Sequence, residues 1–390
     1  MTVSNRQLAP FAVLSASYFA HIGFFNPYLS LWLKDMGLGL WTIGLLTSMQ
    51  AGTRVVAPYF WGWLSDRTGL RVRWMRHCAV AATLAATGLW FEWRIWGLTL
   101  SLLLMFLHTS AMMPLSEAAL AHLVAQDGHF DVKRYGRVRL WGSLGFLVTV
   151  VLAGSWFEHW GMGSFPYWVV LTLLAVVASV MWMPEQPHAT SQKHDARDPD
   201  VGQVLAKPVV RWLFGSVFWH VLAHVAVYAF FSLYLDHLGY SKTIIGGLWA
   251  VSVMCEIAWF MFQGHWLPRM GLATWLLWAA ALTVLRMGLT AMGATSLALL
   301  ILVQTLHAIT FAAHHTVCIA LIHQHFPAEW RGRGQALYAV IGYGLTGVIA
   351  GAGGGMVVER LGLEWIFWMA AMAGGMAAYC ARRVNAVHEQ

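Results

Sequence analysis

The chain has 390 residues, of which 59% are hydrophobic and only 11% are charged. A soluble domain carries roughly 25% charged residues, so the composition excludes a cytosolic enzyme and a disordered chain. The net charge of +7 lies mostly in short loops between apolar runs, which is a membrane-topology signal and not an indication of a nucleic-acid partner.

Apolar stretches of at least 18 residues predict an all-α membrane protein with twelve transmembrane helices. The first stretch is too long for the apolar region of a signal peptide, so we expect it to be retained. The predicted spans are 8–33, 41–64, 74–91, 96–121, 138–157, 164–183, 208–235, 242–263, 272–292, 295–322, 334–357 and 363–381.

The distribution of Lys and Arg among the loops predicts the orientation. With the N-terminus inside the cell, the outer side holds only Lys34, Arg94, Lys242 and Arg360, and most other basic residues fall on the cytoplasmic side. Because short cytoplasmic loops are enriched in Lys and Arg, we expect both termini to be cytoplasmic.

The long polar stretch 184–207 divides the spans into six and six. It reads as a flexible cytoplasmic linker between an N-terminal bundle, 1–183, and a C-terminal bundle, 208–390. The halves also align after a shift of 202 residues: Ser30–Leu46 and Ser232–Leu248 are identical at seven of 17 positions. Parallel repeats of this kind predict two pseudo-symmetric bundles with a substrate site near the middle of the membrane.

Five charged residues are predicted to lie well inside spans: Arg54, Glu117, Arg139, Glu256 and Arg286. A charge at the bilayer centre costs about 2.5–3.5 kcal/mol on insertion scales, so each needs a partner or a wet cavity. They either lock helices together or mark a path for substrate or ions. Three arginines against two carboxylates leave one positive charge for an anionic substrate.

Histidines and aromatic residues within the spans supply further candidates. His307 shares its half of the chain with Glu256 and Arg286, and is a candidate to orient that pair or pass on a proton, although a neutral packing role is the alternative. Most mid-span aromatic residues serve packing. The remaining candidates for substrate contact are His21, Asn26, Tyr28, Tyr228 and Phe311.

The loop after the second predicted span reads GWLSDRTGLRVR and contains Gly62, Asp66, Arg67, Gly69, Arg71 and Arg73. Asp66 can cap a helix start and pair with nearby arginines, and the glycines allow two helix ends to approach closely. This pattern resembles the signature loop of the major facilitator superfamily, which implies that fold and a gating role for the loop.

Three further segments resemble the lactose permease group: YGRVRLWGS around Arg139, LRMG around Arg286 and QTLHAITF around His307. That resemblance implies a substrate contact for Arg139 and substrate or proton handling for Glu256, Arg286 and His307. The group has a proton-coupling carboxylate where this chain has Thr310, so the proton site is expected at Glu256 or Glu117. The phenylpropionate permease family is similar over nearly the whole length, including Arg54 and Glu117.

The resemblance implies proton-coupled symport of a small aromatic carboxylate across a bacterial inner membrane, with no enzymatic activity. No phosphate-binding loop, nucleophile motif or metal-ligand spacing occurs, so we expect no cofactor and no metal. The expected partners are a small-molecule substrate, a proton and the lipid bilayer, and we expect a monomer. The alternatives are a proton-coupled sugar or nucleoside symporter, or an exporter of drugs or metabolites.

Overall fold

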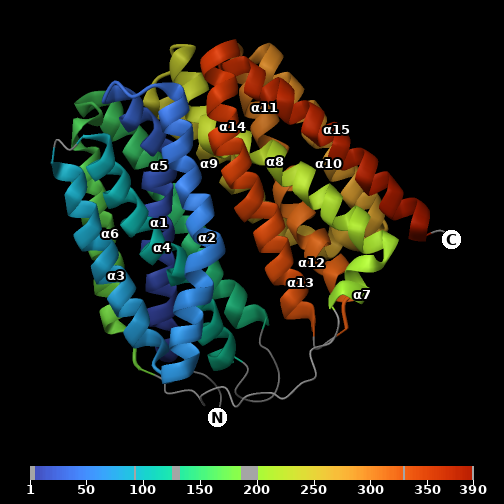
Figure 1. Cartoon of the computed structure of the whole chain (residues 1–390), viewed down its shortest axis with the longest axis horizontal. Helices are drawn as coiled ribbons and strands as arrows, with labels where there is room; N and C mark the ends of the chain where they lie inside the picture. Colours follow the sequence, from blue (N-terminus) through green and yellow to red (C-terminus); the bar gives the residue numbers. More distant parts are fainter. Residues whose placement is uncertain (1–4, 92–93, 125–131, 186–200, 328–329, 389–390) are drawn as a thin grey trace. The chain divides into compact units, whose positions relative to one another are not determined.

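A computed structural model of the chain describes residues 5–91, 94–124, 132–185, 201–327 and 330–388. All regular elements within these ranges are helical (Figure 1). The α-helices are α1 (Asn5–Asp35), α2 (Leu40–Thr68), α3 (Arg71–Thr87), α4 (Ile95–Val124), α5 (Val132–Trp160), α6 (Phe165–Trp182), α7 (Val201–Ala206), α8 (Pro208–His237), α9 (Lys242–Trp266), α10 (Leu272–Gly293), α11 (Leu297–Thr305), α12 (His314–His325), α13 (Arg331–Tyr338), α14 (Thr346–Leu361) and α15 (Leu363–His388).

The predicted spans coincide with these helices. Two of them are series of segments, in which the π-helices η4 (Ala308–Ala313) and η6 (Ala339–Leu345) join α11 to α12 and α13 to α14. Among the described residues, nine helices are long and apolar enough to cross a membrane. The other three predicted spans correspond to α2, α3 and α15, which also carry charged residues such as Arg54 and Arg76.

Part of the predicted linker is helical. Its residues 186–200 lie outside the described residues, but Val201–Ala206 form the short helix α7. Val204 is 3% exposed and belongs to an apolar cluster with Val210 and Leu213 of α8. The end of the linker is therefore helical because it has apolar partners, which the polar composition of the stretch concealed.

The chain divides into two compact units. Unit 1 comprises Met1–Asp35 and Gly52–Asp195, and unit 2 comprises Met36–Ala51 and Ala196–Gln390. The helix α2 therefore contributes its first half to unit 2 and its second half to unit 1. The predicted boundaries, 1–183 and 208–390, differ from this division because they assign the whole of α2 to the N-terminal half.

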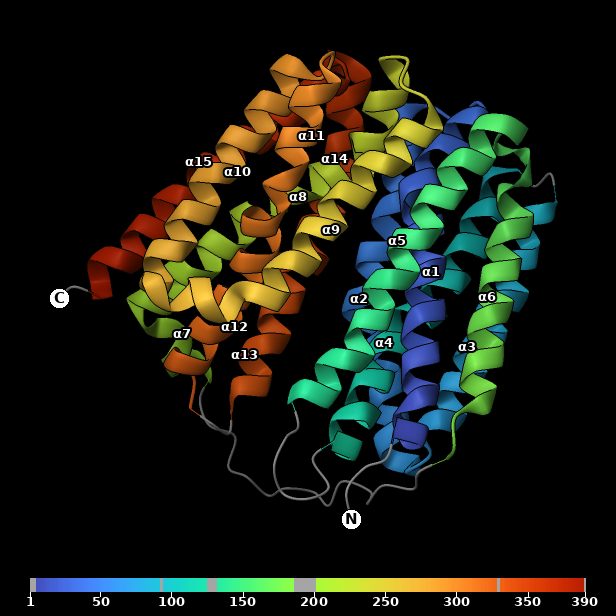
Figure 2. The same cartoon turned by 180° about the vertical axis from the view of Figure 1, so that it is seen from behind.

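In unit 1, α1 packs against α5 and α6, and α3 packs against α4 and α6 (Figure 2). Glycines allow α1 and α5 to come close together. A Cβ atom at Gly145 would overlap the carbonyl oxygen of Ala16, and one at Gly23 would lie 2.6 Å from the carbonyl oxygen of Phe146. This close approach holds α5 beside α1.

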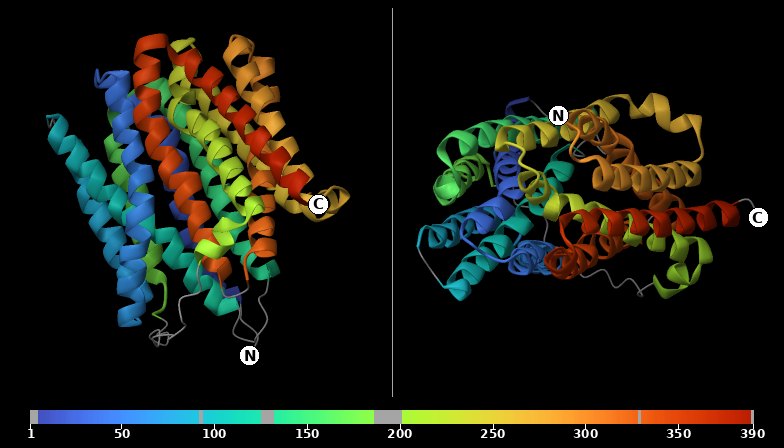
Figure 3. Two further views of the ribbon diagram at one scale, coloured as in Figure 1. Left: turned by 45° about the vertical axis from the view of Figure 1, so that its right-hand side comes forward. Right: turned by 90° about the horizontal axis from the view of Figure 1, so that it is seen from above.

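In unit 2, α15 packs against both α8 and α10 (Figure 3), and α14 packs against α8. Small residues also join α14 to the first half of α2. A Cβ atom at Gly351 would lie 2.5 Å from Cβ of Ser48, and one at Gly355 would lie 3.1 Å from Cα of Trp41. Larger side chains at these glycines would separate the two helices.

The internal repeat is visible in the local structure. Under the shift of 202 residues, the end of α1 at Asp35 corresponds to the end of α8 at His237, and the starts of α2 and α9 also correspond. The turns between them each contain a glycine in the left-handed region, Gly37 with φ of 80° and Gly239 with φ of 85°. The same local sequence therefore produces the same turn in both halves.

Candidate functional site

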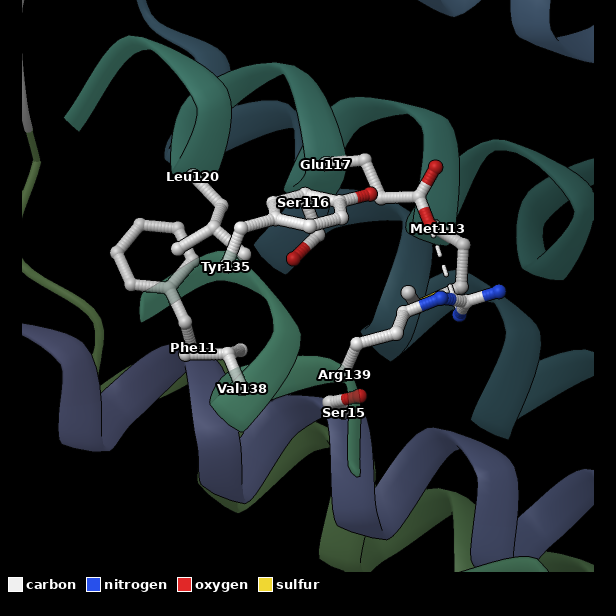
Figure 4. Close-up of a pocket in the computed structure, with 9 residues that line it drawn as sticks. All are labelled: Phe11, Ser15, Met113, Ser116, Glu117, Leu120, Tyr135, Val138 and Arg139. Carbon is white, nitrogen blue, oxygen red and sulfur yellow. Dashed lines mark ion pairs between the residues drawn. The ribbon is translucent and has the colours of Figure 1, made fainter. Parts of the chain in front are cut away.

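Unit 1 contains a pocket in which a charged pair lies among aromatic and hydroxyl side chains (Figure 4). Its lining comes from three helices: α1 supplies two residues, α4 supplies four and α5 supplies three. Tyr135 and Arg139 are one turn apart on α5 and therefore lie on the same face. The lining residues are Phe11, Ser15, Met113, Ser116, Glu117, Leu120, Tyr135, Val138 and Arg139. We call this site the Arg139 pocket.

Arg139 and Glu117 form an ion pair across the Arg139 pocket. Nη1 of Arg139 lies 3.5 Å from Oε1 of Glu117, and the two side chains are 48% and 39% exposed. Arg139 also lies over the ring of Phe19, at 5.0 Å from its centroid, which is a cation–π contact. Because a solvent-accessible ion pair contributes only about 0–1 kcal/mol, an incoming carboxylate can compete with Glu117 for the guanidinium.

Arg54 belongs to the same neighbourhood. Tyr18 lies within electrostatic reach of Arg54, Glu117 and Arg139, and donates a hydrogen bond of 3.2 Å to the carbonyl oxygen of Thr109. The three charged residues that the sequence predicted inside the N-terminal half therefore lie around one tyrosine, although they come from three different helices. Two arginines against one carboxylate give this region a net positive charge.

Three other predicted substrate residues of unit 1 do not line the Arg139 pocket. His21 is 2% exposed and its Nδ1 lies 2.9 Å from Oγ1 of Thr172. Tyr28 is fully buried and donates a hydrogen bond of 2.8 Å to the carbonyl oxygen of Val150. Asn26 lies between them on α1 and is partly buried. The contacts of His21 and Tyr28 join helices of unit 1 to one another.

Unit 2 contains a second charged site, the Arg286 centre, formed by Glu256, Arg286, Gln304, His307 and Thr310. Arg286 is 1% exposed. Its Nη2 donates to Oε1 of Gln304 at 2.8 Å, and its Nη1 lies 3.0 Å from Nδ1 of His307 and 3.1 Å from Oγ1 of Thr310. Gln304 in turn donates to the carbonyl oxygen of Leu248. The guanidinium is thus held in place by neutral acceptors.

His307 lies between Arg286 and Glu256. Because a guanidinium has no acceptor, Nδ1 of His307 accepts its hydrogen bond from Arg286, while Nε2 lies 3.7 Å from Oε2 of Glu256. The ring of His307 stacks on that of Phe311 at 4.8 Å, and the ring of Tyr228 lies 6.3 Å from that of Phe311. The five candidate residues of the C-terminal half therefore lie together.

A π-helix shapes this centre. The segment η4 begins directly after His307 and contains Thr310 and Phe311. An α-helix broken by a π-turn directs its side chains differently from a regular helix, and such turns are frequent at functional sites. The sequence analysis did not identify Gln304, because this side chain is uncharged. It did not identify the π-turn either, because the segment contains no helix-breaking residue.

The loop with the superfamily pattern lies between α2 and α3. Asp66 forms an ion pair of 3.1 Å with Arg71, as predicted. The expectation that Asp66 caps a helix was wrong, because α2 continues to Thr68 and the N-cap position of α3 is Leu70, without a side-chain cap. Instead, the carboxylate of Glu185, after α6, accepts a hydrogen bond of 3.1 Å from the backbone N–H of Val72.

The other members of the pattern have distinct surroundings. Gly69 adopts φ of 70°, which favours glycine. Gly62 has no neighbour within 4 Å of the position a Cβ would take, so the expected close helix approach at that position was wrong. Arg67 lies over the ring of Trp63 at 5.4 Å, and Arg73 is exposed. Within the described part of the chain, no group of three or more His, Cys, Asp or Glu side chains is arranged to hold a metal ion.

Long apolar helices with charged groups enclosed among them are typical of a multi-pass membrane protein. Residues 13–369 match the family described as "MFS_1 like family", and the chain belongs to that family, whose members are transporters and not enzymes. The solved structure of a mutant form of the nucleoside transporter NupG has the same fold, with a TM-score of 0.86 at 15% identity over 97% of this chain and 99% of that one.

Curated relatives match over most of the chain. One is the "Probable 3-phenylpropionic acid transporter" of Escherichia coli (strain K12), 30% identical over 380 residues, covering 94% of this chain and 95% of the relative. Another is the "Maltose permease" of Geobacillus stearothermophilus, 26% identical over 356 residues, covering 90% of this chain and 88% of the relative.

Proposed function

We propose that this protein is a proton-coupled symporter that imports a small aromatic carboxylate across a bacterial inner membrane. The observation that carries the proposal is the accessible Arg139–Glu117 ion pair in a pocket lined by Phe11 and Tyr135. The relative described as a probable 3-phenylpropionic acid transporter supports the same substrate class.

The chemistry of the Arg139 pocket suits such a substrate. A guanidinium presents two parallel donors to a carboxylate, and the pair with Glu117 is weak enough to be exchanged. The partly exposed aromatic side chains of Phe19 and Tyr135 offer apolar area to a ring. Arg54 adds positive charge nearby, which favours an anion over a neutral molecule.

The Arg286 centre is proposed to couple substrate to proton. Glu256 is the first candidate for the proton-binding carboxylate and Glu117 is the second. His307 touches Arg286 with one ring nitrogen and faces Glu256 with the other, so a change in the protonation of Glu256 reaches Arg286 through a single side chain. This geometry supports the role that the sequence resemblance implied for the three residues.

The wider transport cycle is also part of the proposal. We infer that 1–183 and 208–390 act as two six-helix halves that expose the site alternately to the two sides of the membrane. Both termini are proposed to be cytoplasmic, the functional form is proposed to be a monomer, and the loop with Asp66 and Arg71 is proposed to act in gating. The ion pair between these two residues supports a contact that can open and close.

One other function has an observation in its favour. The relative described as a maltose permease favours a neutral sugar as substrate, in which case the arginines would bind hydroxyl groups. A nucleoside symporter and an exporter are further alternatives that the same measurement separates.

The test is uptake into proteoliposomes with an alkaline interior. Radiolabelled 3-phenylpropionate, maltose and uridine are supplied separately, and protein-free vesicles give the passive entry of the weak acid. We expect protein-dependent uptake of 3-phenylpropionate that collapses when the pH gradient is dissipated. Uptake of maltose or uridine alone would contradict the proposed substrate, and efflux against the gradient would favour an exporter.

A further inference from the structure

Three imidazole rings stack inside unit 2, next to the Arg286 centre. His220 and His224 come from α8, and His314 comes from α12. The ring centroids of His220 and His314 are 3.5 Å apart with an interplanar angle of 6°, and those of His220 and His224 are 4.7 Å apart. All three side chains are at most 2% exposed. We call this group the histidine stack.

The hydrogen bonds of two of these rings determine which nitrogen carries the proton. Nε2 of His220 lies 2.6 Å from the carbonyl oxygen of Thr310, and Nδ1 of His224 lies 3.0 Å from the carbonyl oxygen of His220. A carbonyl oxygen can only accept, so Nε2 of His220 and Nδ1 of His224 are the protonated nitrogens. The remaining nitrogens, Nδ1 of His220 and Nε2 of His224, are therefore basic.

Neither basic nitrogen has a hydrogen-bond partner among the described residues, although both are buried. Leaving a buried acceptor unpaired costs stability, and such atoms are uncommon in native proteins. Apolar side chains would fill the same volume without that penalty. Two unpaired basic nitrogens on neighbouring rings are thus available to receive a proton.

The histidine stack is connected to the Arg286 centre by Thr310. The carbonyl oxygen of Thr310 accepts from His220, while its Oγ1 accepts from Nη1 of Arg286 at 3.1 Å. The ring of His224 also lies 6.4 Å from that of His307. A series of close side chains therefore runs from Glu256 through His307 and Arg286 to the stack.

The groups that act electrostatically on the stack are mainly basic. Arg286 comes from α10, His307 precedes η4, and His315 follows His314 on α12. The thiol of Cys318 lies 3.4 Å from Nε2 of His314. The carboxylate of the series, Glu256 on α9, lies beyond His307.

Other helices contribute no ionised group to the described contacts of the stack. From α15, the carbonyl oxygen of Ala377 and the thiol of Cys380 meet α8 at Ser216 and Gly215. On the side of α13 and η6, the phenols of Tyr338 and Tyr343 bond to each other, and Tyr338 also bonds to His315. An added proton on the stack is therefore opposed first by burial, because a charged ring loses its hydration there, and in addition by the positive charge of Arg286, which acts on His220 and His224.

We propose that His220 and His224 store the proton that Glu256 exchanges with water, and that a substrate carboxylate beside Arg286 favours its transfer to them. The inference rests on the proposed proton-coupled function. The anion neutralises the repulsion from Arg286, so that a proton from water adds, by way of Glu256, to the lone pair of Nδ1 of His220 or Nε2 of His224. When the anion leaves, repulsion returns and the proton passes back to water by the same route.

Binding of the anion and of the proton is then mutually favourable, because the coupling between two sites is reciprocal. Only one proton is held at a time, because two imidazolium rings with centroids 4.7 Å apart would repel each other. Substrate and proton together carry no net charge, so the occupied site has the same charge as the unoccupied one.

The test uses substitutions that keep the structural hydrogen bonds. In His220→Gln the amide nitrogen replaces Nε2 as donor to Thr310, and in His224→Asn it replaces Nδ1 as donor to the carbonyl of His220; both remove the basic nitrogen. The matched control is His108→Asn, since Nδ1 of the partly buried His108 also bonds a backbone carbonyl, that of Leu104.

Two quantities are measured with 3-phenylpropionate. One is counterflow exchange at equal pH, and the other is the initial rate of uptake in a pH gradient of one unit, for which coupling to one proton supports about tenfold accumulation. We expect the variant with both substitutions to retain exchange, to lose the initial rate of pH-driven uptake above that of protein-free vesicles, and to take up no proton from weakly buffered solution when substrate is added. His108→Asn should behave as the wild type.

A wild-type rate of pH-driven uptake and full proton uptake in the variant with both substitutions would overturn the inference while leaving the proposed function intact. A wild-type protein that takes up no proton on substrate addition would overturn the proposed function and the inference with it. If a variant does not fold, ¹⁵N NMR of histidine-labelled wild-type protein decides. A new imidazolium signal on addition of substrate supports the inference, and the lack of any change overturns it.

Discussion

Arg286 donates a hydrogen bond of 3.0 Å to Nδ1 of His307, and the opposite nitrogen of that ring faces Glu256 at 3.7 Å. A single imidazole thus separates a fully buried guanidinium from a carboxylate that is 23% exposed. Glu256, which is accessible, can exchange protons with water. The resulting change in its charge acts on the buried Arg286 through the ring of His307.

The first prediction concerns this carboxylate. Glu256→Gln removes the ionisable group but retains its size, so we expect accumulation driven by a pH gradient to be lost while counterflow exchange persists. Uptake and exchange in proteoliposomes measure the two activities. Normal accumulation would transfer the role to Glu117, and failure of the variant to fold would favour a helix-locking role for Glu256.

The second prediction concerns Arg139. Arg139→Lys keeps the charge but loses the two-donor geometry of the guanidinium, so we expect transport of 3-phenylpropionate to fall by at least tenfold, the equivalent of ~1.4 kcal/mol. Arg137→Lys, at an exposed position on the same helix, is the control and should transport normally. Full transport by the Arg139 variant would argue for a neutral substrate.

The third prediction concerns the loop between α2 and α3. Asp66→Asn removes the charge from the ion pair with Arg71, and we expect the conformational equilibrium to shift by about 1–3 kcal/mol, as is typical of allosteric couplings. The accessibility of single cysteines to a charged maleimide from each side of the membrane reports the shift. Unchanged accessibility and unchanged transport would reduce the loop to a topology signal.

The fourth prediction concerns Gln304. Gln304→Leu removes the acceptor that Arg286 uses at 2.8 Å and leaves a buried charged donor unpaired. We expect a loss of about 1.5–3 kcal/mol of stability, measured as thermal unfolding in detergent. The control is Gln263→Leu, because Gln263 is only partly buried and accepts from the neutral hydroxyl of Thr316. Equal losses in the two variants would show that Arg286 does not depend on Gln304.

The fifth prediction compares two glycines of α5. A Cβ atom at Gly145 would overlap the carbonyl oxygen of Ala16, whereas one at Gly136 would meet nothing within 4 Å. We expect Gly145→Ala to destabilise the protein by about 1–3 kcal/mol through overpacking, and Gly136→Ala to stabilise it by up to ~1 kcal/mol through helix propensity. Thermal unfolding tests both, and stabilisation by Gly145→Ala would refute the close packing of α1 and α5.

The sequence by itself determined the helical class, the positions of the spans and the repeated turn. These follow from the length of apolar runs and from glycine at Gly37 and Gly239, which are properties of short segments. It also identified the charged residues Glu117, Arg139, Glu256 and Arg286, because a charge in an apolar run is conspicuous. It did not indicate α7, whose helical form depends on apolar partners in α8.

Only the tertiary structure decided which of these residues meet and through which partners. It brought Arg54, Glu117 and Arg139 around Tyr18, directed His21 and Tyr28 into packing contacts, and placed His307 between Arg286 and Glu256. It also stacked His220 of α8 on His314 of α12, which lie far apart in the chain. Such contacts depend on the rotation of each helix about its axis and on the π-turn after His307. Both are set by side chains that pack across helices distant in the chain. The local pattern of apolar and polar residues therefore does not predict them.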